Sequence, residues 1–218
     1  MKTLPAASLQ HWIVPDWATG AWRRTLFESP EREDRSTDVL YLQTPVLFAD
    51  IRIPVEPNKA REGFAGHATL SGQICRWNRP IDVTPKPGGA IDIGVMYRNG
   101  ARMLECGVER NYLEEWKLVG NIDRHFAATR GAVDVDTDGI RWPADGPLDL
   151  LIAVGDQVIH AWRGPAGSGV AAGSLDATGR WSANRQAGRS ERNAASGDWT
   201  VWSAQLAPGA AERLLEGL

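Results

Sequence analysis

Apolar and polar residues alternate along most of the chain, and this period of two is typical of β-strands. The first half contains such runs at 22–27, 39–44, 46–53, 68–77, 91–108 and 112–119, and the second half at 132–135, 148–154, 157–162 and 199–206. Leu214, Leu215 and Leu218 share one side of residues 208–218, which predicts a short C-terminal helix. The pattern therefore predicts a mainly β fold.

The clearest local signal is a hairpin over residues 91–108. Asn99-Gly100 lies between its two runs, and this pair is favoured in two-residue type I′ turns. Such a turn pairs Arg98 with Ala101, Gly94 with Glu105 and Asp92 with Gly107. One face of the hairpin would then be apolar (Ile91, Ile93, Val95, Tyr97, Leu104, Cys106 and Val108), and the other would carry Asp92, Gly94, Met96, Met103, Glu105 and Gly107. The spacing alone favours an apolar face that points inward and acids that point to water.

The strand pattern is interrupted around residues 120–124, where we place a domain boundary. Residues 1–120 are predicted to form a first β-barrel-like domain, and residues 121–218 a second, smaller β domain with the C-terminal helix. The segment 164–197 is rich in Gly, Ala, Ser and Arg and is predicted to contain a mobile loop.

Composition argues against several classes of function. The 24 Lys and Arg residues nearly balance 27 Asp and Glu residues, which leaves a net charge of −3 and no basic stripe for nucleic acid. Cys75 and Cys106 stand alone and the four histidines are scattered, so we expect no metal site and no cofactor. No run approaches the ~18 apolar residues of a membrane span, and no signal peptide is evident. We expect a cytoplasmic protein without membrane contact.

The candidate chemistry lies in charged residues on predicted strands. Asp50 and Arg52 share a face, and Glu114 lies between Tyr112 and Trp116 on another. If these faces and that of Asp92 and Glu105 line a barrel, the carboxylates raise one another's pKa and Arg52 partly reverses the effect. Such a cluster could hold a polar ligand or transfer protons. The signature motifs of hydrolases, zinc proteases and nucleotide-binding loops are absent from the sequence.

Several segments, taken in order, resemble the fungal Hri-one family of calycin-like proteins, whose function is unsettled. They are Phe48-Ala49-Asp50-Ile51-Arg52-Ile53, Phe64-Ala65-Gly66, Cys75-Arg76-Trp77 with Asp82, Asp92-Ile93-Gly94, Leu104-Glu105-Cys106-Gly107, and Tyr112 with Glu114 and Trp116. The resemblance covers residues 48–118 and implies two β-barrel-like halves of calycin or lipocalin character. It also favours an acidic face that points inward. Asn78 and Val83 depart from the family pattern.

Three functions remain open. The preferred one is a barrel that binds a small, partly apolar molecule through Asp50, Arg52, Trp77, Tyr112 and Trp116, with Arg52 facing an anionic group. The second is a cofactor-independent lyase, isomerase or cyclase that uses Glu105, Glu114 and Asp92 as acid/base groups. The third is a protein-interaction domain whose barrel is fully packed. The sequence leaves the oligomeric state open.

Overall fold

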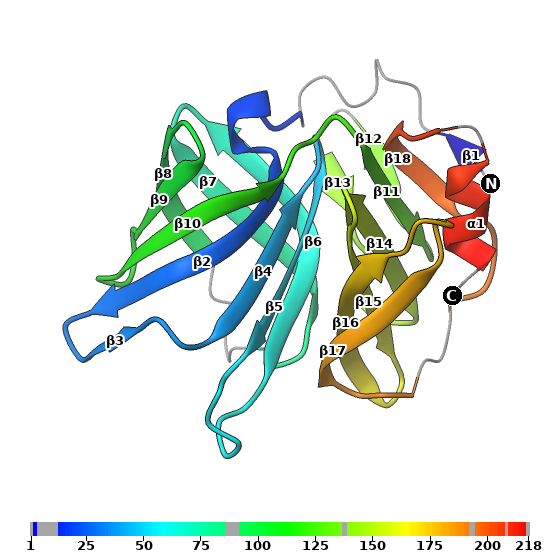
Figure 1. The fold of residues 1–218 in the computed structure, drawn as a ribbon. Coiled ribbons are helices and arrows are strands. Elements are labelled where there is room, and N and C mark those ends of the chain that lie inside the picture. The colour runs from blue at the N-terminus through cyan, green and yellow to red at the C-terminus, as the bar shows by residue number, and fades with distance from the viewer. Residues whose placement is uncertain are drawn as a thin grey trace.

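A computed structural model describes residues 2–3, 13–85, 92–136, 139–191, 195–207 and 209–216. Two large β-sheets lie side by side, with one short helix against the second sheet (Figure 1). The mainly β prediction is confirmed. The predicted C-terminal helix is also present as α1 (Ala210–Glu216), which buries Leu214. None of the described helices is long and apolar enough to cross a membrane.

Eight antiparallel strands of the described chain close into a barrel. In pairing order they are β2 (Gly20–Ser29), β4 (Asp38–Gln43), β5 (Leu47–Ile53), β6 (Glu62–Ser71), β7 (Ile74–Asp82), β8 (Asp92–Asn99), β9 (Arg102–Gly107) and β10 (Leu113–Gly120), and β10 pairs again with β2. A short strand, β3 (Arg32–Asp34), extends β2 at the rim. Closure satisfies the backbone hydrogen bonds that the edge strands of an open sheet would expose.

The barrel interior is filled with large side chains at one end. Its buried cluster comprises Val14, Ala18, Trp22, Val39, Tyr41, Phe48, Phe64, Ala68, Cys75, Trp77, Met96, Met103 and Trp116. A 3-10 helix (Asp16–Ala18) packs at this end, where Arg98 Nη1 donates to the Trp17 carbonyl at 2.8 Å. The Arg98 guanidinium also lies over the Trp22 ring. This end of the barrel is therefore closed.

The predicted 91–108 hairpin forms, but its register differs from the prediction. Asn99 pairs with Arg102, so the turn is Gly100-Ala101, and Gly94 lies opposite Gly107. Gly100 has φ +59° in the first central position, which is typical of a type II′ turn. This slides the pairing by two residues and leaves each side chain on its predicted face.

The orientation of the hairpin is the reverse of the one that spacing alone favoured. Met96, Met103 and Glu105 are buried, whereas Tyr97 and Leu104 are exposed. The inward acidic face that the family resemblance implied is the observed one. The predicted strand 68–77 is also wrong, because Gly72 (φ +61°) begins a turn that separates β6 from β7.

The second sheet is open within the described residues. Its order is β1 (Lys2–Thr3), β18 (Thr200–Gln205), β11 (His125–Arg130), β14 (Leu148–Val154), β15 (Gln157–Gly164), β16 (Gly167–Leu175) and β17 (Trp181–Gly188), with only β1 and β18 parallel. Two short strands, β12 (Asp134–Asp136) and β13 (Gly139–Arg141), form a separate hairpin. No strand pairing of the described residues closes this sheet, and the barrel-like character of the second half stays a prediction.

Much of the segment 164–197, which was predicted to contain a mobile loop, forms β16 and β17. The mobile loop itself stays a prediction. Small residues are needed here for packing: a Cβ on Gly169 would lie 2.4 Å from the Trp162 ring. Val170 and Ala172 are buried in the core between the two sheets. A composition that usually indicates a loop is here a consequence of close packing.

The two sheets share one hydrophobic core. Leu40, Leu42 and Ile51 point outward from the barrel and pack with second-sheet residues such as Ile152 and Ile159. The predicted boundary falls in the short link between β10 and β11, although β1 from the start of the chain joins the second sheet. Independent folding of the two parts stays a prediction.

Candidate ligand site at the open end of the barrel

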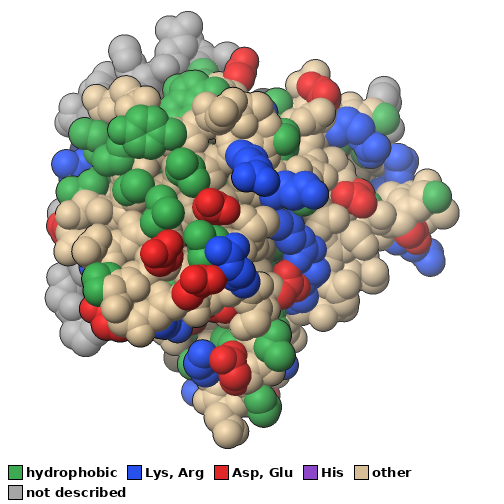
Figure 2. Space-filling view, turned by 60° about the vertical axis from the view of Figure 1, so that its left-hand side comes forward, with side chains coloured by type: hydrophobic (Ala, Val, Ile, Leu, Met, Phe, Trp, Pro, Cys, Tyr) green, Lys and Arg blue, Asp and Glu red, His purple; other side chains and the backbone are tan. Residues whose placement is uncertain are grey.

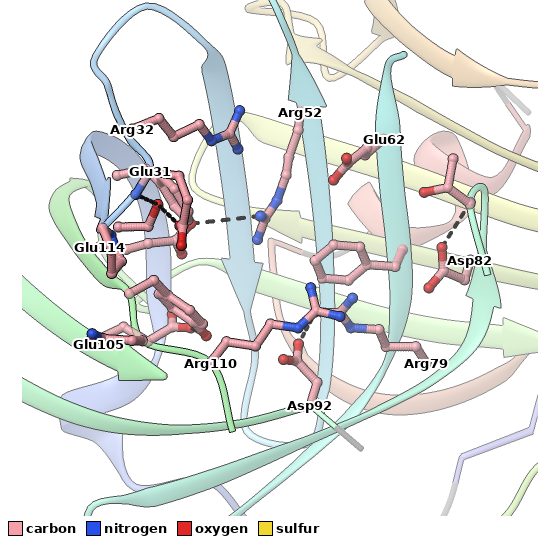
Figure 3. Close-up of a pocket in the computed structure, with 17 residues that line it drawn as sticks. Glu31, Arg32, Arg52, Glu62, Arg79, Asp82, Asp92, Glu105, Arg110 and Glu114 are labelled. Atoms are coloured by element: carbon pink, nitrogen blue, oxygen red, sulfur yellow. Dashed lines mark hydrogen bonds and ion pairs between the residues drawn. The ribbon is translucent and has the colours of Figure 1, made fainter. Parts of the chain in front are cut away.

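A pocket of about 650 Å³ occupies the mouth of the barrel, at the end opposite the 3-10 helix (Figure 3). Charged side chains dominate its lining: Arg32, Arg52, Arg79, Arg110, Glu31, Glu62, Asp82, Asp92, Glu105 and Glu114. Three aromatic rings, those of Phe27, Phe64 and Tyr112, also line it. The pocket combines opposite charges with flat apolar surfaces.

Two buried glutamates lie side by side at the base of this pocket. Glu105 on β9 is the direct cross-strand neighbour of Glu114 on β10, and their exposed fractions are 7% and 2%. Burial and then the neighbouring Glu114 carboxylate raise the pKa of Glu105 to about 8. Glu105 is therefore a neutral acid at pH 7, able to donate a hydrogen bond.

Two arginines contact the Glu114 carboxylate. Arg24 Nη1 donates to Glu114 Oε1 at 2.6 Å, and Arg52 Nη1 lies 3.6 Å from the same oxygen. Arg24 also reaches Asp34 at 3.3 Å, and its side chain is only 5% exposed. Charge-assisted hydrogen bonds are strong in a buried site, so these contacts hold the Glu114 carboxylate firmly in place.

Arg52 is held by Asp50 as well as by Glu114. Its Nε donates to Asp50 Oδ1 at 2.9 Å, and the Asp50 side chain is 1% exposed. The sequence predicted that Asp50 and Arg52 share a face, and the structure places them together as an ion pair. The positive charge of Arg52 is thus already compensated within the protein.

Tyr112 links the mouth of the barrel to Glu105. Its hydroxyl donates to Glu105 Oε1 at 2.8 Å, and its ring stacks on Phe27 with centroids 5.9 Å apart. The ring passes directly over Gly107, where a Cβ would lie 2.3 Å from Tyr112 Cε1 and from the Arg110 carbonyl oxygen. Only glycine at position 107 permits this placement of the ring.

Replacing Tyr112 by Phe is expected to raise the pKa of Glu105 further. The hydroxyl stabilises the charged carboxylate, so its loss favours the protonated form. The shift is expected to be about one pKa unit, the typical effect of one hydrogen bond to a charged group. Carbon-13 NMR of labelled glutamate side chains measures it, with Glu105→Gln to assign the signal. An unchanged or lower pKa would contradict the hydrogen bond.

Asp92 lies apart from the glutamate pair. The sequence predicted that it lies diagonal to Glu105, but the observed register places Glu105 opposite Met96. Asp92 instead forms an ion pair with Arg79 of β7, whose guanidinium lies 3.5 Å from the Phe64 ring centroid. The buried Arg79 Nε has no hydrogen-bond partner in the described structure.

Trp77 and Trp116 do not line the pocket. Both belong to the buried aromatic cluster of the barrel. Trp77 Nε1 donates to the Tyr41 hydroxyl at 3.1 Å, and the Trp116 ring packs against Tyr41 with centroids 5.8 Å apart. Trp116 shares the inner face with Glu114, as the sequence predicted, and the ligand-binding role of both tryptophans stays a prediction.

The sequence analysis missed four arginines of the site. Arg24 follows Trp22 by two positions in a predicted strand, so the alternation could have placed it on the inner face. Arg79 lies beyond the end of the strand that was predicted, and Arg32 and Arg110 lie outside every predicted strand. No local pattern distinguishes these three. Within the described ranges, no group of three or more His, Cys, Asp or Glu side chains is arranged to hold a metal ion.

Comparison with known proteins gives one informative result. No protein-family model and no curated protein sequence matches the chain. Among solved structures, the chain is similar to the uncharacterized protein YLR301w from Saccharomyces cerevisiae, with a TM-score of 0.60 and 14% sequence identity. The match covers 84% of this chain and 98% of the yeast chain. At this identity the likeness establishes a shared fold alone.

Proposed function

We propose that the mouth of the barrel binds a small, partly apolar organic acid. The observation that carries this proposal is the convergence of four arginine side chains on one space, as Figure 3 shows for Arg32, Arg52, Arg79 and Arg110. Arg52 and Arg79 are matched by acids of the protein. Arg32 and Arg110 form no ion pair among the described residues and are free to meet the charge of a ligand.

Four other lining residues suit the rest of such a molecule. The rings of Phe27, Phe64 and Tyr112 offer flat apolar contact, and neutral Glu105 offers a hydrogen bond at the base. A pocket of about 650 Å³ lies within the size range of small-molecule sites. The proposal keeps the calycin-like character expected from the resemblance, but moves the ligand from the aromatic-filled interior to the mouth. A cytoplasmic location stays a prediction.

Arg110→Ala is expected to weaken binding of a small carboxylate about tenfold, the typical cost of losing one charge-assisted hydrogen bond. Benzoate, phenylacetate and citrate are suitable probes, screened by thermal shift and then measured by calorimetry. Arg180→Ala is the matched control, because Arg180 is exposed in the turn between β16 and β17 and does not line the pocket. Equal loss in both variants, or no binding of any such acid by the wild type, would contradict the proposal.

The second candidate is an enzyme that uses Glu105 as a general acid. Its support is that Glu105 stays protonated near neutral pH, is oriented by Tyr112 and lines a pocket. Glu105→Gln distinguishes the two functions. A binding protein keeps its affinity for the probe acid, because glutamine still donates a hydrogen bond, whereas an enzyme loses turnover of whichever acid it transforms.

A further inference from the structure

The outer wall of the barrel carries apolar side chains that no other element covers in the described chain. Cross-strand neighbours on β7, β8 and β9, together with Val108 just after β9, form a surface that we call the outer stripe: Ile74, Val95, Tyr97, Leu104, Cys106 and Val108. Ile74, Tyr97 and Leu104 are 46%, 47% and 40% exposed. Figure 2 shows apolar side chains gathered on the side of the barrel that carries these strands. Contiguous exposed apolar surface commonly marks an interaction site.

A basic hollow adjoins the outer stripe. This depression of about 560 Å³ is lined by Tyr97 and Leu104 together with Arg35, Arg98, Arg102 and Lys117, against one acid, Glu115. Arg102 and Lys117 are direct cross-strand neighbours on β9 and β10. Neither has an acidic partner among the described residues, and like charges placed opposite each other on a sheet are destabilising. Both charges would gain from an external anion.

We propose that the outer stripe and the basic hollow together dock an acidic, amphipathic peptide segment of another protein. Its apolar side chains would cover Tyr97 and Leu104, and its carboxylates would meet Arg102 and Lys117. This surface lies on the outside of the barrel and shares no lining residue with the pocket at the mouth. The inference is therefore independent of the proposed ligand site.

The positive charge of the basic hollow favours an acidic peptide over a second copy of the chain as the partner. A two-fold contact brings the same patch of both subunits together. An axis through the basic hollow would thus set two clusters of Arg and Lys side chains against each other, with only Glu115 from each copy to offset them. An acidic peptide supplies the missing negative charge.

A random peptide library displayed on phage, selected against the full chain, tests the proposal. Recovered peptides are expected to combine Asp or Glu with Leu or Phe. Their affinity should fall about tenfold or more in Arg102→Glu/Lys117→Glu, which reverses two charge-assisted contacts. Arg124→Glu/Arg180→Glu makes the same charge change at exposed sites outside this surface and should bind normally. Circular dichroism verifies that each variant is folded.

Cys106 supplies a second readout that does not depend on a variant. Cys75 is buried, so Cys106 in the outer stripe is the thiol accessible to Ellman's reagent, and a bound peptide should slow its reaction. Recovered peptides without acidic residues, or equal binding by both charge variants, would overturn the proposal. So would a wild-type dimer in sedimentation that Leu104→Ser abolishes, or binding to phosphatidylserine vesicles in place of peptides.

Discussion

A Glu105→Gln variant is expected to be more stable than the wild type in alkaline solution, by on the order of 5 kcal/mol. Burial and the adjacent Glu114 raise the pKa of Glu105 from the unfolded value of 4.5 to about 8. Between about pH 4.5 and 8, the folded protein therefore binds more protons than the unfolded chain. Stability from this group is present below about pH 4.5 and is lost as the pH rises through about 8.

Glutamine has the same shape and stays neutral, so the variant does not suffer this loss. Urea unfolding at a series of pH values measures the free energy of unfolding of both proteins. The difference between them should grow between about pH 4.5 and 8 and then level off. Glu109→Gln is the matched control, since Glu109 is exposed in the loop after β9 and should follow the wild type. Parallel curves for wild type and Glu105→Gln would show that Glu105 titrates normally.

Asp149→Ala is expected to destabilise the protein by about 3–5 kcal/mol, the typical cost of removing one partner from a buried charged network. Asp149 on β14 is fully buried. It accepts hydrogen bonds from Arg130 at 2.9 and 3.1 Å and from the Ala195 backbone N–H at 2.8 Å, and it lies 3.1 Å from His160 Nε2. The substitution would leave these groups without their acceptor inside the protein.

The pKa of Asp149 supports this expectation. Burial alone would raise it, but the hydrogen bonds from His160, Ala195 and Arg130 hold it below its ordinary value. The stabilisation is thus present above the unfolded pKa and fades in acid. Chemical unfolding at neutral pH measures the loss, with Asp156→Ala in the exposed turn before β15 as the control. A loss as small as that of the control would show that this network contributes little to folding.

The sequence predicted which residues share a strand face better than it predicted strand register. Gly100 fits two turn types, type I′ with Asn99 and type II′ with Ala101, whose registers differ by two residues. Both registers leave Glu105 on the same face, so the apolar pattern cannot choose between them.

The candidate site was predictable only where its residues lie on strands. Asp50, Arg52 and Glu105 alternate with apolar neighbours, Glu114 shares a face with Trp116, and the barrel brings these charged residues together. Arg24 reaches Glu114 across 90 positions of sequence because β10 closes the barrel against β2. Closure is a long-range event that no local pattern predicts.

The local pattern of the hairpin predicted the wrong face as the inner one. An apolar row from Ile93 to Val108 ordinarily lies inside, yet the described structure exposes Tyr97 and Leu104 and buries Glu105. The inner face is already filled by aromatic rings such as Trp77, which a Cβ on Gly94 would approach to 3.1 Å. Packing with residues distant in sequence, and not local hydrophobicity, fixed the orientation.

Native mass spectrometry of freshly purified protein tests the ligand site at the barrel mouth most directly. The wild type should carry a small acidic molecule in its folded charge states. Arg32→Glu/Arg110→Glu, which reverses the charge of the two pocket arginines that form no ion pair among the described residues, should be bare. A folded wild type without any bound molecule, or the same adduct on the double variant, would contradict a ligand site in this pocket.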